Sequence, residues 1–593
     1  MKLHLLVRLI WASTLAAWGV VSLPAHAQTV SPMPPDTMVM TPGGVDLRSG
    51  SLKMDRTLLS MGEGQIGALD FRRITRTYGF REPPGRMNGF NHNWDIRFKR
   101  QSRPGAAGAD VSVTSDELSF TFFDLGADYS PDLTSAGNHA KLARTTVGSN
   151  YYYTLTTADG TVVVSQNIAS DGTALATSVT KANGAAYSLT YDSLGPSGSY
   201  RLRRVTSNAG YALLFQYAGN GYVSKACILN LAITPAPSDN NCPGGAKSVA
   251  YGYSGYTMVS ETDASGAVWP FTSTYVDGGT SFTQTFKEPG AATPYLTVDY
   301  EYVDNYKLAV SRQTFADGKQ FNYTWSVVYP QEGEYGLALV PTHYSENSSA
   351  TVEFKVWRPN AYVPPKVSPG PAKVTDSLGR TTSFDICMTC VPALVLSKTL
   401  PGGMKATYDY DSYGHIVKTT ITPNTGSGEP AIVTSATYNC STMTFCNKPV
   451  TEVDAKGATT TSTYSSVHGQ ILITTGPAVG GVQPQTRYIY AQRSAWIKNG
   501  AGGYVATAPI WVLAEESLCK TGAPHSSGTG CAIAGDEVRT TYDYGPNSGP
   551  NNLLLRGKVV DAGGLALRTC YGYDADGRKI SETTPNANLT SCP

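Results

Sequence analysis

The sequence predicts an all-β protein built from one long antiparallel repeat sheet that curls along its length. Charged residues make up 15% of the chain, which contains 60 Gly and 36 Tyr. This composition suits long sheets with turns and fits neither a disordered chain nor a helical bundle. In addition, a degenerate unit of roughly twenty residues recurs, which is typical of units that bury an apolar face by stacking on their neighbours.

Alternating runs of apolar and polar residues place the strands. Residues 69–74 and 94–98 alternate with the period of a half-buried strand, and Gly or Pro ends each run. Similar runs occur at 117–122, 151–156 and 211–217. We therefore expect antiparallel strands throughout and almost no helix beyond residue 27.

The recurring unit opens with a Tyr pair or Tyr-Asp and closes at an Asp/Gly turn. Copies lie at 374–385, 408–420, 450–464 and 559–584. Their signature residues are Tyr408, Asp409, Tyr410, Asp411, Gly414, Asp454, Gly457, Tyr573, Asp574, Gly577 and Arg578. This pattern resembles the rearrangement-hotspot (RHS) or YD-repeat family, whose unit runs Y-D-x-x-G-R-L-x-x-x-T-D-x-x-G-x-x-T-x-Y. Residues 45–52 and 76–78 also look like the segment that precedes such repeats.

The resemblance implies a β-shell of the kind found in bacterial polymorphic toxins and insecticidal toxin complexes. In that family the sheet spirals around a hollow interior and isolates a polypeptide cargo. Complete members often continue into a C-terminal toxin, which is not recognisable in this sequence. If about 400 residues are extended, the sheet covers about 6,000 Å². A sphere of that area has a radius of about 22 Å, little more than a 100-residue domain needs, so we expect an open or partial shell.

The first residues have the pattern of a secretory signal peptide. Lys2 and Arg8 precede an apolar stretch at 9–23, and Ala25-His26-Ala27 forms a small-x-small cleavage site. A membrane anchor is the alternative, but the apolar run is shorter than the roughly 20 residues that a span needs. We expect cleavage after Ala27 and a secreted or envelope-associated product without a transmembrane span.

Composition shifts divide the rest of the chain. An extended segment at 28–44 precedes a β-region with degenerate repeats at 45–331. A Pro-rich segment at 332–371 marks the boundary between this region and the clearer YD repeats at 372–593.

The chain contains ten cysteines, and an even number behind a signal peptide favours disulfides. Taken in order they form five short-range pairs, which is a hypothesis because sequence does not fix connectivity. The candidates are Cys227, Cys242, Cys387, Cys390, Cys440, Cys446, Cys519, Cys531, Cys570 and Cys592. The spacing of Cys387 and Cys390 also fits half a zinc site or a redox dithiol, but no second half and no helical start accompany it.

Two further motifs carry weaker signals. Residues 62–67 match G-x-G-x-x-G, but an alternating strand follows where a dinucleotide site needs a helix, so a tight turn is favoured. Asp574 and Asp576 suggest part of a calcium loop, but the later bidentate carboxylate is missing, so an Asp/Gly turn is favoured. We predict no cofactor and no metal.

Charge and histidine placement argue against two classes of function. The formal net charge is +1, and only Arg72, Arg73, Arg76 and Arg81 cluster, so nucleic acid is not an expected partner. The six histidines after residue 27 form no H-E-x-x-H motif, and no G-x-S-x-G elbow occurs. His92 and His415 are the least implausible catalytic residues. We nominate no catalytic site and expect that the protein is not an enzyme.

The sequence thus favours a structural shell protein for toxin delivery or intercellular contact, with a polypeptide cargo or a second shell chain as partner. The alternative is an envelope adhesin or carbohydrate-binding protein that uses an exposed Tyr-rich face to bind a surface glycan or protein. Cross-strand tyrosine ladders that only stabilise the sheet explain the same residues without a ligand.

Overall fold

A computed structural model gives the structure of the chain from residue 36 to residue 592. Within that span it does not describe residues 76–89, 103–108, 115–118, 125–127, 132–139, 148–149, 168–172, 194–199, 277–280, 304–306, 329–337, 346–348, 358–365, 369, 391–392, 526–527, 563 and 575. The expected signal peptide at 1–27, Arg76 and Arg81 therefore lie outside the described residues.

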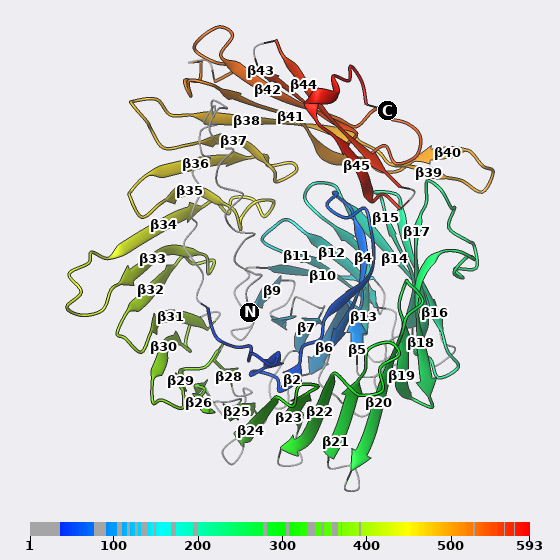
Figure 1. The fold of residues 1–593 in the computed structure, drawn as a ribbon, viewed down its shortest axis with the longest axis vertical. Helices are drawn as coiled ribbons and strands as arrows, with labels where there is room; N and C mark the ends of the chain where they lie inside the picture. The colour runs from blue at the N-terminus through cyan, green and yellow to red at the C-terminus, as the bar shows by residue number, and fades with distance from the viewer. Residues whose placement is uncertain are drawn as a thin grey trace, which may run out of the picture.

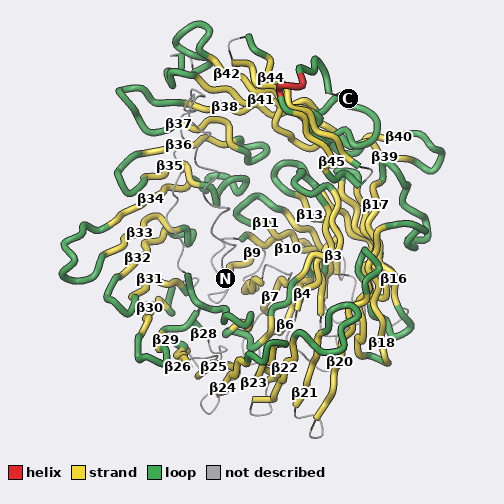
Figure 2. The backbone as a smooth tube through the Cα atoms, viewed as in Figure 1, coloured by secondary structure: helices red, strands yellow, loops and turns green. Residues whose placement is uncertain are grey.

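The regular elements among the described residues are β-strands, joined by loops and turns, and one 3-10 helix at Pro585–Ala587 near the C-terminus (Figure 2). The first strands are β1 (Val45–Asp46), β2 (Ser51–Leu52), β3 (Arg56–Met61), β4 (Leu69–Thr75), β5 (Phe90–His92), β6 (Arg97–Ser102), β7 (Ala109–Thr114), β8 (Ser119–Asp124), β9 (Asp128–Pro131), β10 (Lys141–Val147), β11 (Asn150–Thr156), β12 (Val162–Asn167), β13 (Thr173–Thr180), β14 (Ala186–Ser193) and β15 (Tyr200–Ser207). The middle strands are β16 (Tyr211–Tyr217), β17 (Val223–Asn230), β18 (Lys247–Ser254), β19 (Thr257–Thr262), β20 (Val268–Val276), β21 (Ser281–Phe286), β22 (Leu296–Val303), β23 (Lys307–Phe315), β24 (Gln320–Val328), β25 (Ala338–Ser345), β26 (Ser349–Glu353), β27 (Val356–Trp357), β28 (Lys366–Val367), β29 (Lys373–Thr375) and β30 (Thr381–Cys387). The last strands are β31 (Leu394–Thr399), β32 (Lys405–Tyr410), β33 (Ile416–Thr422), β34 (Ile432–Tyr438), β35 (Pro449–Val453), β36 (Thr459–Tyr464), β37 (Ile471–Thr475), β38 (Gln485–Arg493), β39 (Trp496–Lys498), β40 (Tyr504–Ala506), β41 (Ile510–Cys519), β42 (Glu537–Asp543), β43 (Gly557–Ala562), β44 (Ala566–Tyr573) and β45 (Lys579–Thr583).

Nearly all strands from β6 onward belong to one antiparallel sheet in which sequence neighbours pair. Only the hairpins β27–β28 and β39–β40 stand apart, so β26 pairs with β29 and β38 pairs with β41. Near its start the sheet also meets itself, because β6 pairs with the first half of β13. At the other end β45 pairs only with β44 among the described strands, and the sheet curls without closing end to end (Figure 1). The predicted all-β, curling repeat sheet is confirmed, and around the expected boundary at 332–371 the described strands β24, β25, β26 and β29 pair in succession.

A small sheet of β3, β4 and β5 lies inside the curl (Figure 1). Phe71 of β4 packs against Phe215 of β16 with ring centroids 5.6 Å apart, and Phe90 of β5 packs against Phe271 of β20 at 6.3 Å. These rings belong to the largest buried apolar cluster of the molecule. The small sheet therefore packs on the inner side of this part of the curl.

The segment from residue 36 to residue 53 lines the same side of the main sheet. Gln313 on β23 donates its amide to the carbonyl of Gly43 at 2.8 Å, and a Cβ at Gly43 would lie 2.3 Å from the Gln313 Oε1 atom. Lys398 on β31 forms an ion pair with Asp36 at 3.0 Å. We call the side of the main sheet that contacts residues 36–53 and β3–β5 the inner face, and the opposite side the outer face.

The later part of the sheet returns to the strand ends of the earlier part and forms a seam. Turns at 443–447 and 495–511 contact turns at 157–160, 181–184 and 207–210. Backbone hydrogen bonds across the seam run from Asn447 to Ala158 (3.1 Å), from Lys498 to Leu231 (2.8 Å) and from Trp511 to Asn183 (2.9 Å). Because these bonds satisfy polar groups at strand ends, the seam fixes the curvature of the sheet.

Strand bulges recur along the sheet, and an aromatic side chain satisfies the backbone at most of them. At one example the ladder between β30 and β31 shifts so that Leu396 is the extra residue, and Tyr410 of β32 donates its hydroxyl to the carbonyl of Val395 at 2.7 Å. The same arrangement pairs Ala176 with Tyr191, Leu202 with Tyr217, Val223 with Tyr253, Val310 with Trp325, Pro449 with Tyr464, and Leu513 with Tyr544. The second Tyr of the Y-D-Y unit is therefore a structural cap for a bulge.

Replacing Tyr410 with Phe removes this cap and leaves the Val395 carbonyl without its donor. We expect a loss of about 1 kcal/mol in the free energy of unfolding, because a buried acceptor loses its partner while the ring stays in place. Tyr152→Phe is the control, since no described residue binds the Tyr152 hydroxyl. Equal urea midpoints for the two variants would contradict the capping role.

The structure joins the ten cysteines in the five adjacent pairs, and no described cysteine is free. The pairs are Cys227–Cys242, Cys387–Cys390, Cys440–Cys446, Cys519–Cys531 and Cys570–Cys592. Cys227–Cys242 ties a loop over a small apolar cluster on the outer face of β16 and β17. Among the described residues, no helix has the length and apolar character to cross a membrane.

Candidate functional site

The inner face of the repeat strands β29 to β36 is the candidate functional surface. Directly paired residues share a face, so the register from Lys398 through Ala406 and Ile421 to Ile432 marks the inner side. The adjacent inner register runs from Tyr408 to Thr419 and Thr434. Further along, the inner residues are Ala436, Glu452 and Thr460. On the outer face, by contrast, Asp409 lies directly opposite Lys418.

The residues before β1 hold one end of this surface. Met38 packs against a cluster that contains Phe384, Ile386 and Tyr408. Burial raises the pKa of Tyr408, with a smaller contribution from the Asp36 carboxylate. The first Tyr of the repeat unit is thus an inner-face core residue, and it anchors the segment that precedes the sheet.

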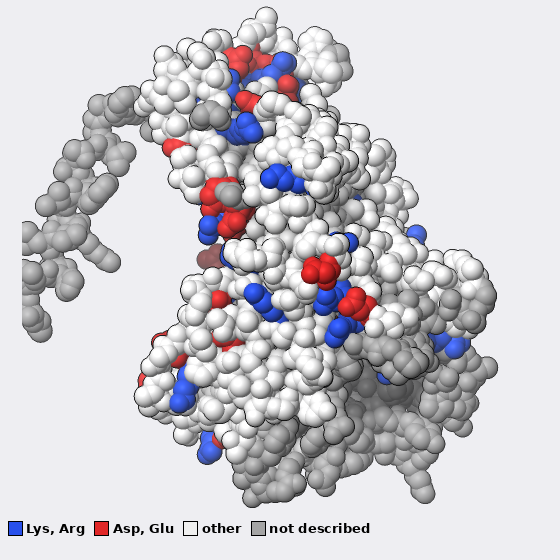
Figure 3. All heavy atoms as spheres, turned by 90° about the vertical axis from the view of Figure 1, so that its right-hand side faces the viewer, with Lys and Arg blue, Asp and Glu red and all other residues white. Residues whose placement is uncertain are grey.

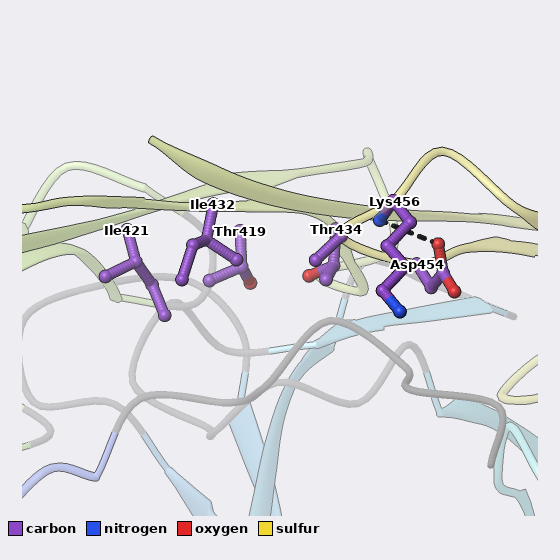
Figure 4. Close-up of a pocket in the computed structure, with 7 residues that line it drawn as sticks. Thr419, Ile421, Ile432, Thr434, Asp454 and Lys456 are labelled. Atoms are coloured by element: carbon purple, nitrogen blue, oxygen red, sulfur yellow. Dashed lines mark hydrogen bonds between the residues drawn. The ribbon is translucent and has the colours of Figure 1, made fainter. Parts of the chain in front are cut away.

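Beyond that cluster the inner face carries an apolar pocket (Figure 4). Thr419, Ile421, Ile432 and Thr434 of β33 and β34 line it side by side, and Asp454, Ala455 and Lys456 of the next turn close one end. About 250 Å³ of the pocket is open to water. Ile432 remains 47% exposed, so the pocket offers apolar area, and the charged residues that line it are Asp454 and Lys456 of the turn. Sequence reasoning missed these residues, because the run at 416–422 does not alternate between apolar and polar residues.

The Asp of each repeat copy builds the turn that follows. One carboxylate oxygen of Asp411 accepts the backbone N–H groups of Tyr413 and His415 at 2.8 and 2.9 Å, and Gly414 has a φ of 78°. Asp376, Asp454 and Asp574 each accept the N–H groups two and four residues later in the same way. The glycines at the third position after Asp454 and Asp574, Gly457 and Gly577, have φ values of 81° and 79°. A positive φ at this position is what the turn requires.

In two of these turns the second carboxylate oxygen binds an arginine. Arg578 contacts Asp574 at 2.7 Å, and Arg380 contacts Asp376 at the same distance. The hydrogen bond from Arg380 lowers the pKa of Asp376. With both oxygens engaged by N–H donors, Asp574 is arranged for a turn and not for calcium, which needs several free oxygen ligands.

A related turn makes the sharpest pH prediction. Asp263 accepts hydrogen bonds from the Ser265 hydroxyl at 2.6 Å and from Trp269 Nε1 at 2.9 Å, and these bonds lower its pKa to about 2. A carboxyl whose folded pKa is depressed contributes stability above its unfolded value of 3.8, and this contribution is lost as the pH falls toward 2.

Asp263→Asn should therefore be less stable than the wild type at pH 5, and this difference should shrink between pH 4 and pH 2. Urea midpoints at several pH values measure it. Asp409→Asn, at an exposed carboxyl of the outer face, is the control for the loss of one negative charge. A difference that stays constant down to pH 2 would show that the charge of Asp263 is not the cause.

The two histidines considered from sequence lie in packed environments. His92 is 1% exposed, and its ring lies between Phe71 and Phe215 at 5.9 and 5.1 Å. His415 contacts the Asp411 carboxylate through Nδ1 at 2.9 Å and stacks on Tyr438 at 4.3 Å. Both arrangements are those of structural side chains, although the His415–Asp411 pair resembles the orienting half of a catalytic dyad.

Cysteine sulfurs in disulfides do not serve as zinc ligands. Among the described residues, His415 lies beside Cys440 and Cys446, and Asp536 lies beside Cys519 and Cys531. In both groups the sulfurs are bonded to each other. Cys387 and Cys390 are also bonded to each other, so their close spacing is that of a disulfide at the end of a strand. The proximity of His415 to a cysteine pair was not visible in the sequence because it joins neighbouring hairpins.

Charges of both signs are interspersed on the face drawn in Figure 3, where Lys and Arg lie next to Asp and Glu. Among the candidate arginines, Arg72 pairs with Asp70 at 2.9 Å and Arg73 with Glu261 at 2.8 Å. These two side chains therefore neutralise carboxylates and do not form a basic patch.

Comparison with known proteins gives structural neighbours only. No family model and no curated protein matches the chain. A TcdB2-TccC3 structure without its hypervariable C-terminal region is 11% identical, with a TM-score of 0.31 over 89% of this chain and 27% of that one. A Photorhabdus luminescens Tc holotoxin pore is 10% identical, with a TM-score of 0.26 over 90% and 30%. The N-terminal domain of the effector SpvB from Salmonella typhimurium strain LT2 is 9% identical, with a TM-score of 0.20 over 49% and 98%. This chain spans less than a third of the two toxin chains.

Proposed function

We propose that this chain is an exported structural protein that forms part of the wall of an RHS-type shell, in toxin delivery or intercellular contact. The observation that carries the proposal is the curled sheet whose inner face, from β29 to β36, carries an apolar pocket at which Ile432 is 47% exposed, whereas Asp409 and Lys418 lie on the outer face. An inner surface of this kind contacts a polypeptide without binding one particular sequence. The repeat resemblance supports the same role.

The partner in this proposal is a polypeptide cargo or a second shell chain, and the wall itself has no reactive centre. In this proposal a second shell chain adds to the edge at β45, which among the described strands pairs only with β44. The proposed location is outside the cytoplasm, after removal of residues 1–27.

Photo-crosslinking from opposite faces of one strand tests this function. A benzophenone amino acid at Ile432 points from the inner face, whereas one at the next residue, Val433, points from the outer face, and both positions are exposed. In protein purified from its native source, we expect position 432, and not 433, to capture a polypeptide that also survives protease treatment of the intact assembly. Equal capture from both positions, or capture that protease removes, would contradict the enclosing role.

The adhesin alternative is less well supported. The repeat residues Tyr408 and Tyr410 face inward, and Tyr573 donates its hydroxyl to the carbonyl of Leu555 at 2.8 Å. These tyrosines are therefore occupied in packing and do not form the exposed binding surface that this alternative requires. Saturable binding on a glycan array would restore it.

A further inference from the structure

A separate cleft lies between the small inner sheet and the main sheet. Its floor is aliphatic and comes from four strands, with Val113 on β7, Leu155 on β11, Val163 on β12 and Val179 on β13. These side chains are between 1% and 9% exposed. About 250 Å³ of the cleft is open to water, which is smaller than the roughly 300 Å³ at which drug-sized pockets begin.

One wall of the cleft is aromatic and held in place by hydrogen bonds. Trp94 donates its indole N–H to the carbonyl of Asp70 at 2.7 Å, and Tyr187 donates its hydroxyl to the carbonyl of Ala68 at 3.0 Å. The two rings lie 5.1 Å apart. Because both polar atoms are satisfied by backbone carbonyls, the rings present only apolar surface to the cleft, and their positions are fixed before any ligand arrives.

The rim is polar, and its charges do not cancel. The Asp70 carboxylate is engaged by Arg72 at 2.9 Å and by the Asn93 amide at 3.1 Å. Burial raises the pKa of Asp70. The exposed ammonium of Lys181 has no ion-pair partner among the described residues. The rim therefore has one uncompensated positive charge above an apolar floor.

We propose that this cleft binds a small amphipathic monocarboxylate, with its apolar body on the Val113, Leu155, Val163 and Val179 floor and its carboxylate at Lys181. Trp94 covers the body of the ligand, and the Asp70–Arg72 pair borders the carboxylate. A cation is disfavoured because it meets Lys181, and a neutral molecule of the same shape loses the charge-assisted hydrogen bond. This site is distinct from the repeat surface and does not depend on the wall function.

Calorimetric titration of the full exported chain with octanoate, octanol and octylamine at pH 7 tests the proposal. We expect octanoate to bind at one saturable site, about tenfold or more tighter than octanol, because a hydrogen bond to a charged group contributes about 1.5 to 3 kcal/mol. Octylamine should bind weakest.

Two variants separate the charge from the cavity. Lys181→Gln should reduce octanoate affinity to that of octanol and leave octanol binding unchanged, whereas the control Lys418→Gln, on the exposed outer face, should change neither. Val163→Phe fills the floor and should abolish binding of both ligands. Octanoate binding no tighter than octylamine, binding at many sites without saturation, or unchanged affinity in Lys181→Gln would each overturn the proposal. If Val163→Phe does not fold, the octanoate affinity of Lys181→Gln alone tests the proposal.

Discussion

Replacing Arg73 with Met is expected to destabilise the fold by about 3 to 5 kcal/mol, because it leaves a buried carboxylate without its partner. Glu261 on β19 is 0% exposed, and Arg73 on β4 is 4% exposed and 2.8 Å away. Arg73 also lies over the ring of Phe90 at 4.7 Å. The pair joins the small inner sheet to the main sheet, and the remaining cation, Arg56, is 3.8 Å from Glu261 and largely in solvent.

The stability deficit of Arg73→Met is expected to decrease as the pH falls. Burial raises the pKa of Glu261 even with two arginines nearby, and removing Arg73 raises it further. A carboxyl whose folded pKa is raised destabilises the fold at high pH, and protonation relieves this as the pH falls toward the ordinary Glu value of 4.5. The deficit of Arg73→Met in urea midpoint should therefore be largest at pH 7 and smaller near pH 5.

The double variant Arg73→Met with Glu261→Gln is the control. It removes the unpaired charge, so it should be more stable at pH 7 than Arg73→Met alone, with a coupling energy of about 1 to 3 kcal/mol in the double-mutant cycle. Additive effects of the two substitutions would show that the pair does not act as a unit.

Phe71→Ala is expected to lower the free energy of unfolding by about 3 to 5 kcal/mol. Phe71 is 0% exposed and makes an edge contact with Phe215 at a centroid distance of 5.6 Å. Truncation leaves a cavity between β4 and β16 that the surrounding sheets cannot close without shifting. The loss should therefore appear as a lower midpoint in both thermal and urea unfolding.

Leu378→Ala is the control for Phe71→Ala, since Leu378 is 75% exposed at a turn tip. Its effect should stay within about 0.5 kcal/mol. If Phe71→Ala were as mild, the small inner sheet would not be packed against the main sheet as described.

Local features of this fold could be predicted from the sequence because local chemistry decides them. The run at 69–74 is a strand, and the Asp/Gly turns at Asp411 and Asp574 form through hydrogen bonds between residues two and four apart. The prediction of a strand at 94–98 was only partly right. Trp94 lies in a turn, held by its bond to the Asp70 carbonyl, and the strand begins at Arg97.

Features that depend on curvature could not be predicted. Thr507 donates its hydroxyl to the carbonyl of Asn208, a residue 299 positions earlier, and no periodicity records such a contact. The inner sheet likewise fills the curl through contacts between distant segments such as Arg73 and Glu261. Alternation gives the two faces of a strand, but not which face lies inside, because this is set by the sign and extent of the curl.

A disulfide cross-link across the seam tests most directly whether the sheet curls back on itself. Asn208 also donates its amide to the carbonyl of Ala508 at 3.2 Å, so residues 208 and 507 are close in space. We predict that Asn208→Cys with Thr507→Cys oxidises to a disulfide that non-reduced peptide mapping recovers, whereas Leu378→Cys with Thr507→Cys does not. Absence of the 208–507 cross-link, with both cysteines labelled as free thiols in the folded protein, would contradict a sheet that curls back on itself at the seam.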